Sequence, residues 1–187
     1  MILLLAAVLG LAIGLLSGGS LKNIRPYPLK GLLFPILAWL LKAGAAFFLQ
    51  PQQGAVLVCL VQYGLLFAFL AMNIRRPIWP FFVSLGTLCN FLVILLNGGR
   101  MPVSASLIGQ LPQRLEQLQM NQIYAYCVTD GQTMLPSLGD ILRIGSKGTP
   151  FGFASVGDLL LCAGICILCI QLTRPSRSKE PQPTQPE

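Results

Sequence analysis

The sequence GAVLVCLVQYGLLFAFLAMNI, residues 54–74, decides the fold class. It contains no charged residue, and it is as long as the roughly 20 apolar residues that a helix needs to cross the hydrocarbon region of a bilayer. Its apolar residues do not alternate with polar ones, as they would in a strand of a transmembrane barrel. Because the hydrocarbon region supplies no water for unpaired backbone groups, we expect this stretch to form a transmembrane helix.

Four further apolar stretches flank it, each bounded by polar, Gly or Pro residues: 1–16, 31–49, 78–96 and 154–172. Only 10% of the chain is charged and 54% is hydrophobic, whereas about a quarter of a soluble domain is charged. We therefore predict an all-α, polytopic membrane protein with five transmembrane helices. It divides into a four-helix transmembrane region (1–97), an extracytoplasmic cap between the fourth and fifth helices (98–153), the fifth transmembrane helix (154–172) and a disordered cytoplasmic tail (173–187).

The basic residues indicate the orientation of the chain. If residues 17–30 are cytoplasmic, eight of the 13 Lys and Arg residues fall on the cytoplasmic side: Lys22, Arg25, Lys30, Arg75, Arg76, Arg174, Arg177 and Lys179. The turn at residues 50–53 carries no charge and falls outside, as the positive-inside rule prefers. We expect the N-terminus outside and the C-terminus in the cytoplasm. The first stretch lacks the basic start and small-residue cleavage site of a signal peptide, so we expect it to remain in the mature protein.

The composition argues against several classes of function. The chain has no histidine, so the usual general base and zinc ligand are missing. Its net charge of +7 is scattered along the sequence, without the basic stripe and aromatic platform of a nucleic-acid-binding protein. Of the six cysteines only Cys127 lies outside the apolar stretches, and cysteines within such helices act as small hydrophobic residues. We expect no metal site, no cofactor and no nucleic-acid partner.

The first apolar stretch contains three glycines at spacings of four residues, Gly10, Gly14 and Gly18. Such a ladder leaves bare backbone on one face of a helix, and a neighbouring helix can approach it closely. We expect this helix to pack tightly within the monomer.

The outer segment, residues 97–153, is long for a connection and is where we expect a binding surface. A turn-forming run opens it, and the following residues of this run are candidates for an outer-loop site: Asn97, Gly98, Gly99, Arg100, Pro102 and Ser104. Residues 112–122 predict a short amphipathic helix. A repeated Ser-x-Gly-Asp pattern follows at 137–140 and 155–158, in which the serine is expected to cap a helix and the aspartate to lie in its first turn. Asp140 completes the candidate outer-loop site.

These features together resemble a known family. The leucine-rich first stretch with its glycines, the Asn-Gly-Gly-Arg-Met-Pro-Val-Ser run at 97–104, and the Leu-Gly-Asp-Ile and Ser-Val-Gly-Asp-Leu-Leu segments are similar to small bacterial membrane proteins grouped as domain of unknown function 5317. The resemblance covers about residues 1–172. It implies a protein of the bacterial plasma membrane, and it implies no activity and no catalytic residue.

Three polar residues near the middle of predicted helices form a second candidate site. Lys42, Gln62 and Asn90 belong to three different apolar stretches, and a cation at this depth costs at least ~2.5 kcal/mol unless it finds a partner or reaches the membrane surface. If they converge, they line a small outward-facing pocket in which Asp158 is the natural ion-pair partner of Lys42. The alternative is that Lys42 extends to the outer headgroups and the two amides bond to neighbouring helices.

The favoured interpretation of the sequence is a non-enzymatic binding, scaffolding or transport-accessory role. The expected partners are the lipid bilayer and a lipid, a small molecule or another membrane protein. The alternative is a membrane-embedded hydrolase or protease that uses the Asp140 and Asp158 pair, because two carboxylates in one site can divide the roles of acid and base. The sequence itself names no ligand and no reaction.

Overall fold

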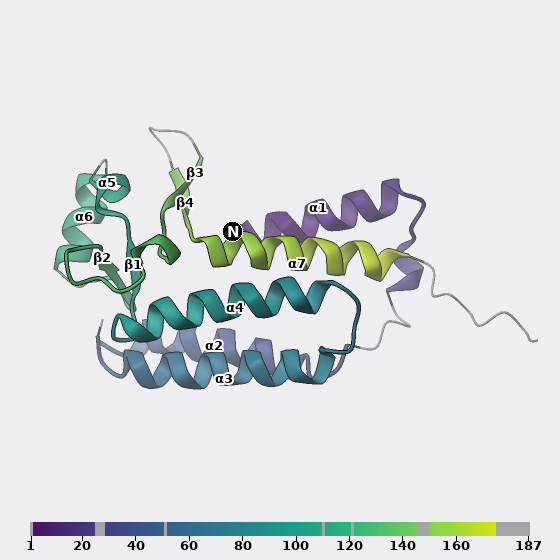
Figure 1. The fold of residues 1–187 in the computed structure, drawn as a ribbon, viewed down its shortest axis with the longest axis horizontal. Coiled ribbons are helices and arrows are strands. Elements are labelled where there is room, and N and C mark those ends of the chain that lie inside the picture. The colour runs from purple at the N-terminus through teal and green to yellow at the C-terminus, as the bar shows by residue number, and fades with distance from the viewer. Residues whose placement is uncertain are drawn as a thin grey trace, which may run out of the picture.

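The computed structural model describes residues 2–24, 29–50, 52–109, 111–120, 122–145 and 150–174. Five long helices run side by side, with a smaller cap at one end (Figure 1). They are α1 (Ile2–Leu16), α2 (Leu33–Phe48), α3 (Ala55–Asn73), α4 (Trp79–Leu96) and α7 (Val156–Thr173). Each coincides with one of the predicted apolar stretches. From residue 175 on, the predicted disordered tail lies outside the described residues, as do Arg25, Arg177 and Lys179.

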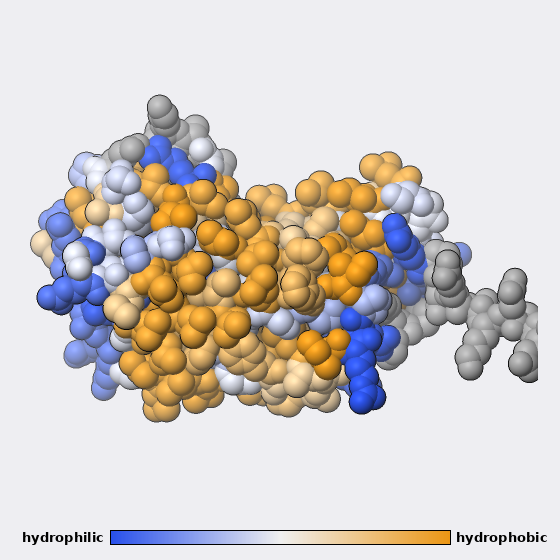
Figure 2. Space-filling view, viewed as in Figure 1, coloured by the Kyte–Doolittle hydropathy of each residue, from blue (hydrophilic) through white to orange (hydrophobic). Residues whose placement is uncertain are grey.

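Three of the helices, α3, α4 and α7, are long and apolar enough to cross a membrane. The other two are apolar but shorter, with 15 residues in α1 and 16 in α2, which at ~1.5 Å per residue is somewhat less than the hydrocarbon thickness. Figure 2 shows a hydrophobic surface over the helices, with hydrophilic residues gathered over the cap and in a smaller group at the opposite end. An apolar surface of this extent is typical of a protein surrounded by lipid.

The helices pack in the order α1, α7, α4, α3, α2, and α1 and α2 at the two ends of this row have little contact with each other. Glycines allow the closest approaches. A Cβ atom added at Gly10 of α1 would lie 2.5 Å from the Cys166 carbonyl oxygen of α7, and one at Gly14 would collide with the Thr173 hydroxyl. Two members of the predicted ladder therefore pack within the monomer. Gly18 was wrongly included, because it lies beyond the end of α1 with no atom near enough to meet an added Cβ.

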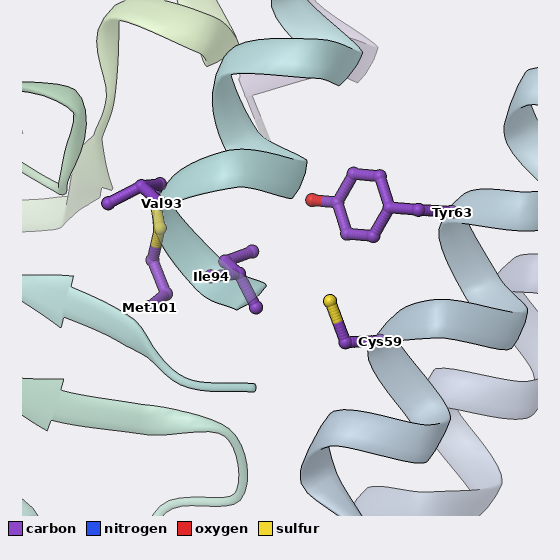
Figure 3. Close-up of a cluster of buried hydrophobic side chains, with 5 residues drawn as sticks. All are labelled: Cys59, Tyr63, Val93, Ile94 and Met101. Atoms are coloured by element: carbon purple, nitrogen blue, oxygen red, sulfur yellow. The ribbon is translucent and has the colours of Figure 1, made fainter. Parts of the chain in front are cut away.

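A buried cluster attaches the cap to the helices. Cys59 and Tyr63 of α3 point toward Ile94 of α4, and Met101, the first residue after the connecting turn, lies against Val93 (Figure 3). Burying these apolar side chains together, at roughly 25 cal/mol per Å² of apolar surface removed from solvent, fixes the position of the cap above α3 and α4.

The cap is not purely helical, so the all-α prediction is wrong for this part of the chain. Strand β1 (Met101–Val103) pairs in parallel with β2 (Tyr126–Val128), and β3 (Leu142–Gly145) pairs antiparallel with β4 (Pro150–Ala154). The remaining elements are short helices: η1 (Leu21–Asn23) at the opposite end of the molecule, and α5 (Ala105–Ile108), α6 (Pro112–Gln119) and η2 (Pro136–Leu138) in the cap. The predicted amphipathic helix corresponds to α6, which buries Leu118 against Val103 and Ile108.

Candidate functional site

A cavity of about 420 Å³, here called the central cavity, lies among the helices beneath the cap. Side chains from all five long helices and from the cap line it. Its size is within the ~300–1,000 Å³ typical of small-molecule sites. It has room for a ligand and is surrounded by the most conspicuous polar residues of the membrane region.

The lining changes character along the helix axes. The polar and charged lining side chains all lie toward the cap: Lys42, Gln62, Tyr63, Thr87, Asn90, Tyr126, Asp140 and Asp158. They are accompanied there by the apolar Leu3, Ile94, Met101 and Phe153. Toward the opposite end the lining side chains are apolar: Leu66, Phe69, Leu70, Trp79, Val83, Leu161, Ile165 and Leu168. On α3 and α7 the polar positions are those nearer the cap, whereas on α4 Thr87 and Asn90 lie between Val83 and the apolar Ile94 at the cap end. The central cavity thus has one polar end and one apolar end.

A buried hydrogen-bond network forms one wall of the polar end. The Asn90 amide nitrogen donates to Asp158 Oδ1 at 2.9 Å, and the Ser155 hydroxyl donates to the Asn90 side-chain oxygen at 2.8 Å. The Ser155 amide N–H donates to Asp158 Oδ2 at 3.0 Å. Gly157 must lack a side chain here, since an added Cβ would collide with the Asn90 amide oxygen. The network joins α4 to the start of α7, and both Asp158 oxygens are used in it.

Lys42 extends into the same cavity from α2 without joining the network. Its ammonium nitrogen lies 5.9 Å from the centre of the Tyr126 ring, a cation–π distance. No carboxylate among the described residues forms an ion pair with it, although the charges of Asp158 and Asp140 act on it. Lys42 and Asp158 therefore line one cavity, as do Gln62 and Asn90, but the direct ion pair between Lys42 and Asp158 does not form.

Asp140 reaches the cavity from the cap. Its backbone pairs with the β1 region, where its N–H donates to the Pro102 carbonyl at 2.8 Å and its own carbonyl accepts from the Ser104 N–H at 3.0 Å. The residue is only 6% exposed, and no described residue donates a hydrogen bond to its carboxylate. Burial, reinforced by the charge of Asp158 and opposed by that of Lys42, raises the pKa of Asp140 to about 7. Asp140 can therefore be neutral or ionised near physiological pH.

A second cavity of about 620 Å³, here called the cap cavity, adjoins the first. Ile2 and Leu5 of α1 form one side of it, and apolar residues of the cap with Arg114 of α6 form the other. Tyr126, Asp140 and Phe153 line both cavities. Burial and the neighbouring carboxylates raise the pKa of Tyr126 to about 12, so its hydroxyl keeps its proton and can donate. The residues shared by the two cavities thus include a hydroxyl that keeps its proton, that of Tyr126, and a carboxyl group that titrates, that of Asp140.

The family model that describes a family of unknown function, DUF5317, matches residues 26–170. The chain belongs to this family. The resemblance inferred from the sequence motifs is therefore confirmed. No curated protein and no solved structure matches the chain. The fold and the cavities are thus the available guides to what this DUF5317 chain does.

The turn run that opens the cap has structural roles in the DUF5317 chain. The Asn97 side chain donates to the Val93 and Met134 carbonyls and accepts from the Met134 N–H, which ties the cap loop to the end of α4. Gly98 and Gly99 have positive φ values of 70° and 79°, and a Cβ at Gly99 would collide with the backbone at Ala55. These contacts account for the turn without a ligand.

The other members of the candidate outer-loop site are dispersed. Pro102 is buried beneath Gly139, and the Ser104 hydroxyl lies 2.9 Å from that of Ser106. Arg100 lines a separate polar groove of the cap with Asp130. Of this candidate set, only Asp140 lies at the central cavity.

The two Ser-x-Gly-Asp motifs have different structures. Ser155 and Asp158 form a reciprocal capping box at the start of α7, as predicted. The first motif does not begin a helix: Ser137 lies within η2, and Asp140 pairs with Val103 in a β-bridge. The prediction of a helix cap at Ser137 is wrong, because backbone pairing with β1 takes the place of a helical first turn.

Sequence analysis did not identify Tyr63, Thr87, Tyr126 or Arg114 as lining residues. An aromatic or a threonine in an apolar stretch, such as Tyr63 or Thr87, is the expected content of a packed helix. Tyr126 and Arg114 belong to the cap, where no local pattern shows which residues face the cavities. Within the described residues, no group of three or more His, Cys, Asp or Glu side chains is placed to hold a metal ion. The arrangement offers hydrogen bonds and charges to a ligand that has one polar end and one apolar end.

Proposed function

We propose that this DUF5317 protein is a five-span protein of the bacterial plasma membrane that binds an amphipathic ligand in its central cavity, with its cap outside the cell. The two shorter helices complete the spans by packing along full-length neighbours, α1 on α7 and α2 on α3. A thinner local bilayer and tilting of the neighbours accommodate their length. In this role the protein holds or presents its ligand, and it carries out no reaction.

The distribution of charge supports this orientation. Lys22, Lys30, Arg75, Arg76 and Arg174 lie at the end of the helices away from the cap. The Asn23 side chain donates to the Thr173 carbonyl and the Asn73 side chain to the Lys30 carbonyl, which draws the α1–α2, α3–α4 and C-terminal connections together. All the acidic residues of the described chain are at the cap end. The positive-inside rule assigns to the cytoplasm the end at which Lys and Arg residues gather close to the ends of the spans.

The segregated lining of the central cavity is the observation that supports ligand binding most strongly. A packed core needs no polar end, and a water-filled pore needs no closed apolar end. A hydrocarbon chain among Leu66, Leu70 and Leu161, with its polar head near Gln62 and Asn90, would satisfy both halves of the lining at once. Burial of the chain would stabilise the complex by roughly 0.8 kcal/mol per methylene group.

The two tryptophans provide a direct test of binding. Trp79 is 1% exposed and lines the apolar end of the cavity, whereas Trp39 is 68% exposed on the outer surface of α2. A monoacylglycerol with a brominated chain should quench Trp79 saturably in a Trp39→Phe variant in detergent. In the matched Trp79→Phe variant, quenching of Trp39 should rise without saturation, as expected for a probe dissolved in the micelle. Equal, unsaturable quenching of both tryptophans would contradict the proposal.

A hydrolase remains the second candidate, because Asp140 and Asp158 line one cavity and the charge of Asp158 contributes to the raised pKa of Asp140. The geometry favours binding instead, because each Asp158 oxygen accepts a hydrogen bond from the protein, one from Asn90 of α4 and one within the capping box of α7, which gives this carboxylate a structural role. Mass spectrometry of the same monoacylglycerol after incubation separates the two. Release of fatty acid by the wild type and not by Asp140→Asn would establish the hydrolase, and intact lipid supports binding.

A further inference from the structure

Charges of both signs line the two cavities. Lys42 and Asp158 line the central cavity, Arg114 lines the cap cavity, and Asp140 lines both. The Asp158 carboxylate already accepts hydrogen bonds from the Asn90 amide and the Ser155 N–H. Lys42 and Asp140 are the two charged side chains of the polar end for which the described residues provide no ion pair and no hydrogen bond. A ligand that carries one charge of each sign would complement both side chains.

Of these two side chains, Asp140 places the stronger constraint on the chemistry of the ligand. Asp140 is 6% exposed as a residue, and its carboxylate has no hydrogen-bond partner among the described residues and opens onto both cavities, where a ligand or a proton can satisfy it. A primary ammonium group, which has three N–H donors and a positive charge, is the complementary group.

Lys42 is a cation, so the complementary group of the ligand is an anion. The Lys42 ammonium nitrogen lies 5.9 Å from the centre of the Tyr126 ring. A cation at this depth is stabilised by an anion in the same low-dielectric space. A phosphate bonded close to a primary ammonium would bring an anion to Lys42 while the ammonium meets Asp140.

We propose that the ligand of the central cavity is a lipid with a zwitterionic head of the phosphoethanolamine type, its ammonium bound by Asp140, its phosphate facing Lys42 and its chain in the apolar end. The proposal rests on the proposed function and specifies its ligand class. The cap cavity, with Ile2 and Leu5 of α1 on one side, is the route by which the lipid head reaches Asp140 from the membrane surface.

Competition against the brominated monoacylglycerol tests the head group. The competitors are lysophospholipids of one chain length that carry phosphoethanolamine, phosphocholine or a phosphate monoester, and free phosphoethanolamine tests the head alone. We expect the phosphoethanolamine lipid to compete at least tenfold better than the other two lipids at pH 8. The free head should not compete at the same concentration, because it lacks the chain.

Single substitutions assign the two charges. Asp140→Asn should reduce the affinity for the phosphoethanolamine lipid about tenfold and leave that for the phosphate monoester lipid unchanged or increased. Lys42→Met should weaken both. Glu116→Gln and Lys22→Met, which remove exposed charges away from both cavities, are the matched controls and should leave the affinities unchanged.

The outcomes separate this inference from the function it rests on. If the brominated probe binds saturably at Trp79 and all three lipids compete equally, with or without Asp140, the zwitterionic head is excluded and amphipathic binding stands. If the probe does not bind saturably, the proposed function is wrong, and the inference about the head group, which rests on it, is wrong as well. A melting temperature of Asp140→Asn within a few degrees of the wild type excludes misfolding as the cause of lost binding.

Discussion

At the scale of single residues, Asp140 is the group whose charge depends on conditions near neutrality. In the cavities it faces Asp158 of α7, Lys42 of α2, Tyr126 of β2 and Arg114 of α6. Its pKa rises from 3.8 to about 7 because burial disfavours the ionised form. The folded protein therefore holds a proton at this site over a pH range in which the unfolded chain has lost it.

The stability of the ligand-free protein should fall as pH rises through this range. Between about pH 4 and pH 7 the folded state binds more protons than the unfolded state, so the free energy of unfolding decreases with rising pH, by up to about 4 kcal/mol from this one group. Melting temperatures in detergent at pH 5, 6, 7 and 8 measure the decrease. Asp140→Asn should flatten most of the slope. A slope equal in the two proteins would show that Asp140 does not have the raised pKa.

Ligand binding should respond to pH in the opposite direction. An ammonium head needs the ionised form of Asp140, whose fraction grows from about a tenth at pH 6 to nine-tenths at pH 8 if its pKa is about 7. The affinity for the phosphoethanolamine lipid should then increase about tenfold over this range, since the apparent affinity scales with the competent fraction. The phosphate monoester lipid should show no such increase. Asp140→Asn should bind the phosphoethanolamine lipid with little dependence on pH, and a tenfold rise in its affinity between pH 6 and pH 8 in this variant would contradict the assignment.

The Asn90 network makes a separate prediction about stability. Asn90→Leu leaves the Ser155 hydroxyl and one Asp158 oxygen without their partner, and each buried polar group so left costs ~1–3 kcal/mol. The melting temperature should fall by several degrees. Gln62→Leu is the matched control, because no described residue hydrogen-bonds to the Gln62 side chain, and it should be neutral or stabilising. Equal effects of the two substitutions would mean that the network contributes nothing to stability.

At the scale of elements, the glycine contact between α1 and α7 is the most sensitive packing feature. An added Cβ at Gly10 meets the backbone of Cys166, which cannot move without shifting α7. Gly10→Ala should destabilise the protein by ~1–3 kcal/mol and expose α1 to limited proteolysis. Gly44→Ala on α2, where an added Cβ meets no atom, is the control and should stabilise slightly, because alanine is the better helix former. Resistance of Gly10→Ala to both assays would contradict the close packing of α1.

The elements also show what can be predicted from sequence alone. The five helices could be predicted from long apolar stretches, because every residue in such a stretch contributes to the signal. The strands of the cap have three to five residues each, and β1 finds its partner about 25 positions away in β2 through pairing that leaves no local periodicity. The same limit explains the contrast between Ser155, which caps a helix, and Ser137, whose neighbouring Asp140 is drawn into pairing with Val103.

The candidate site, too, could be predicted from the sequence only in part. The depth of Lys42, Gln62 and Asn90 in apolar stretches could be read from the sequence, and the structure gathers all three at one cavity. The sequence could not show that Asp158 bonds to Asn90 and Ser155 and not to Lys42. That choice depends on the register between α4 and α7. Tyr126 and Asp140 come to the cavity from a cap whose pairing no local pattern encodes.

At the scale of the whole molecule, the orientation makes a prediction that requires no ligand. In a variant without the six native cysteines, Gln117→Cys on the exposed side of α6 should react with a membrane-impermeant maleimide in intact cells. Lys22→Cys at the opposite end should react only after lysis. The reverse pattern would place the cap in the cytoplasm and overturn the assignment of sidedness made from the basic residues.

Native mass spectrometry of the protein purified from membranes tests most directly the proposal that the central cavity holds a lipid. We predict one retained lipid with the mass of a phosphoethanolamine lipid on the wild type and on Leu57→Phe, whose side chain points outward from α3. Leu66→Phe, which fills the apolar end of the central cavity, should lose it. Absence of any retained lipid, or equal retention by Leu57→Phe and Leu66→Phe, would contradict ligand binding in the central cavity.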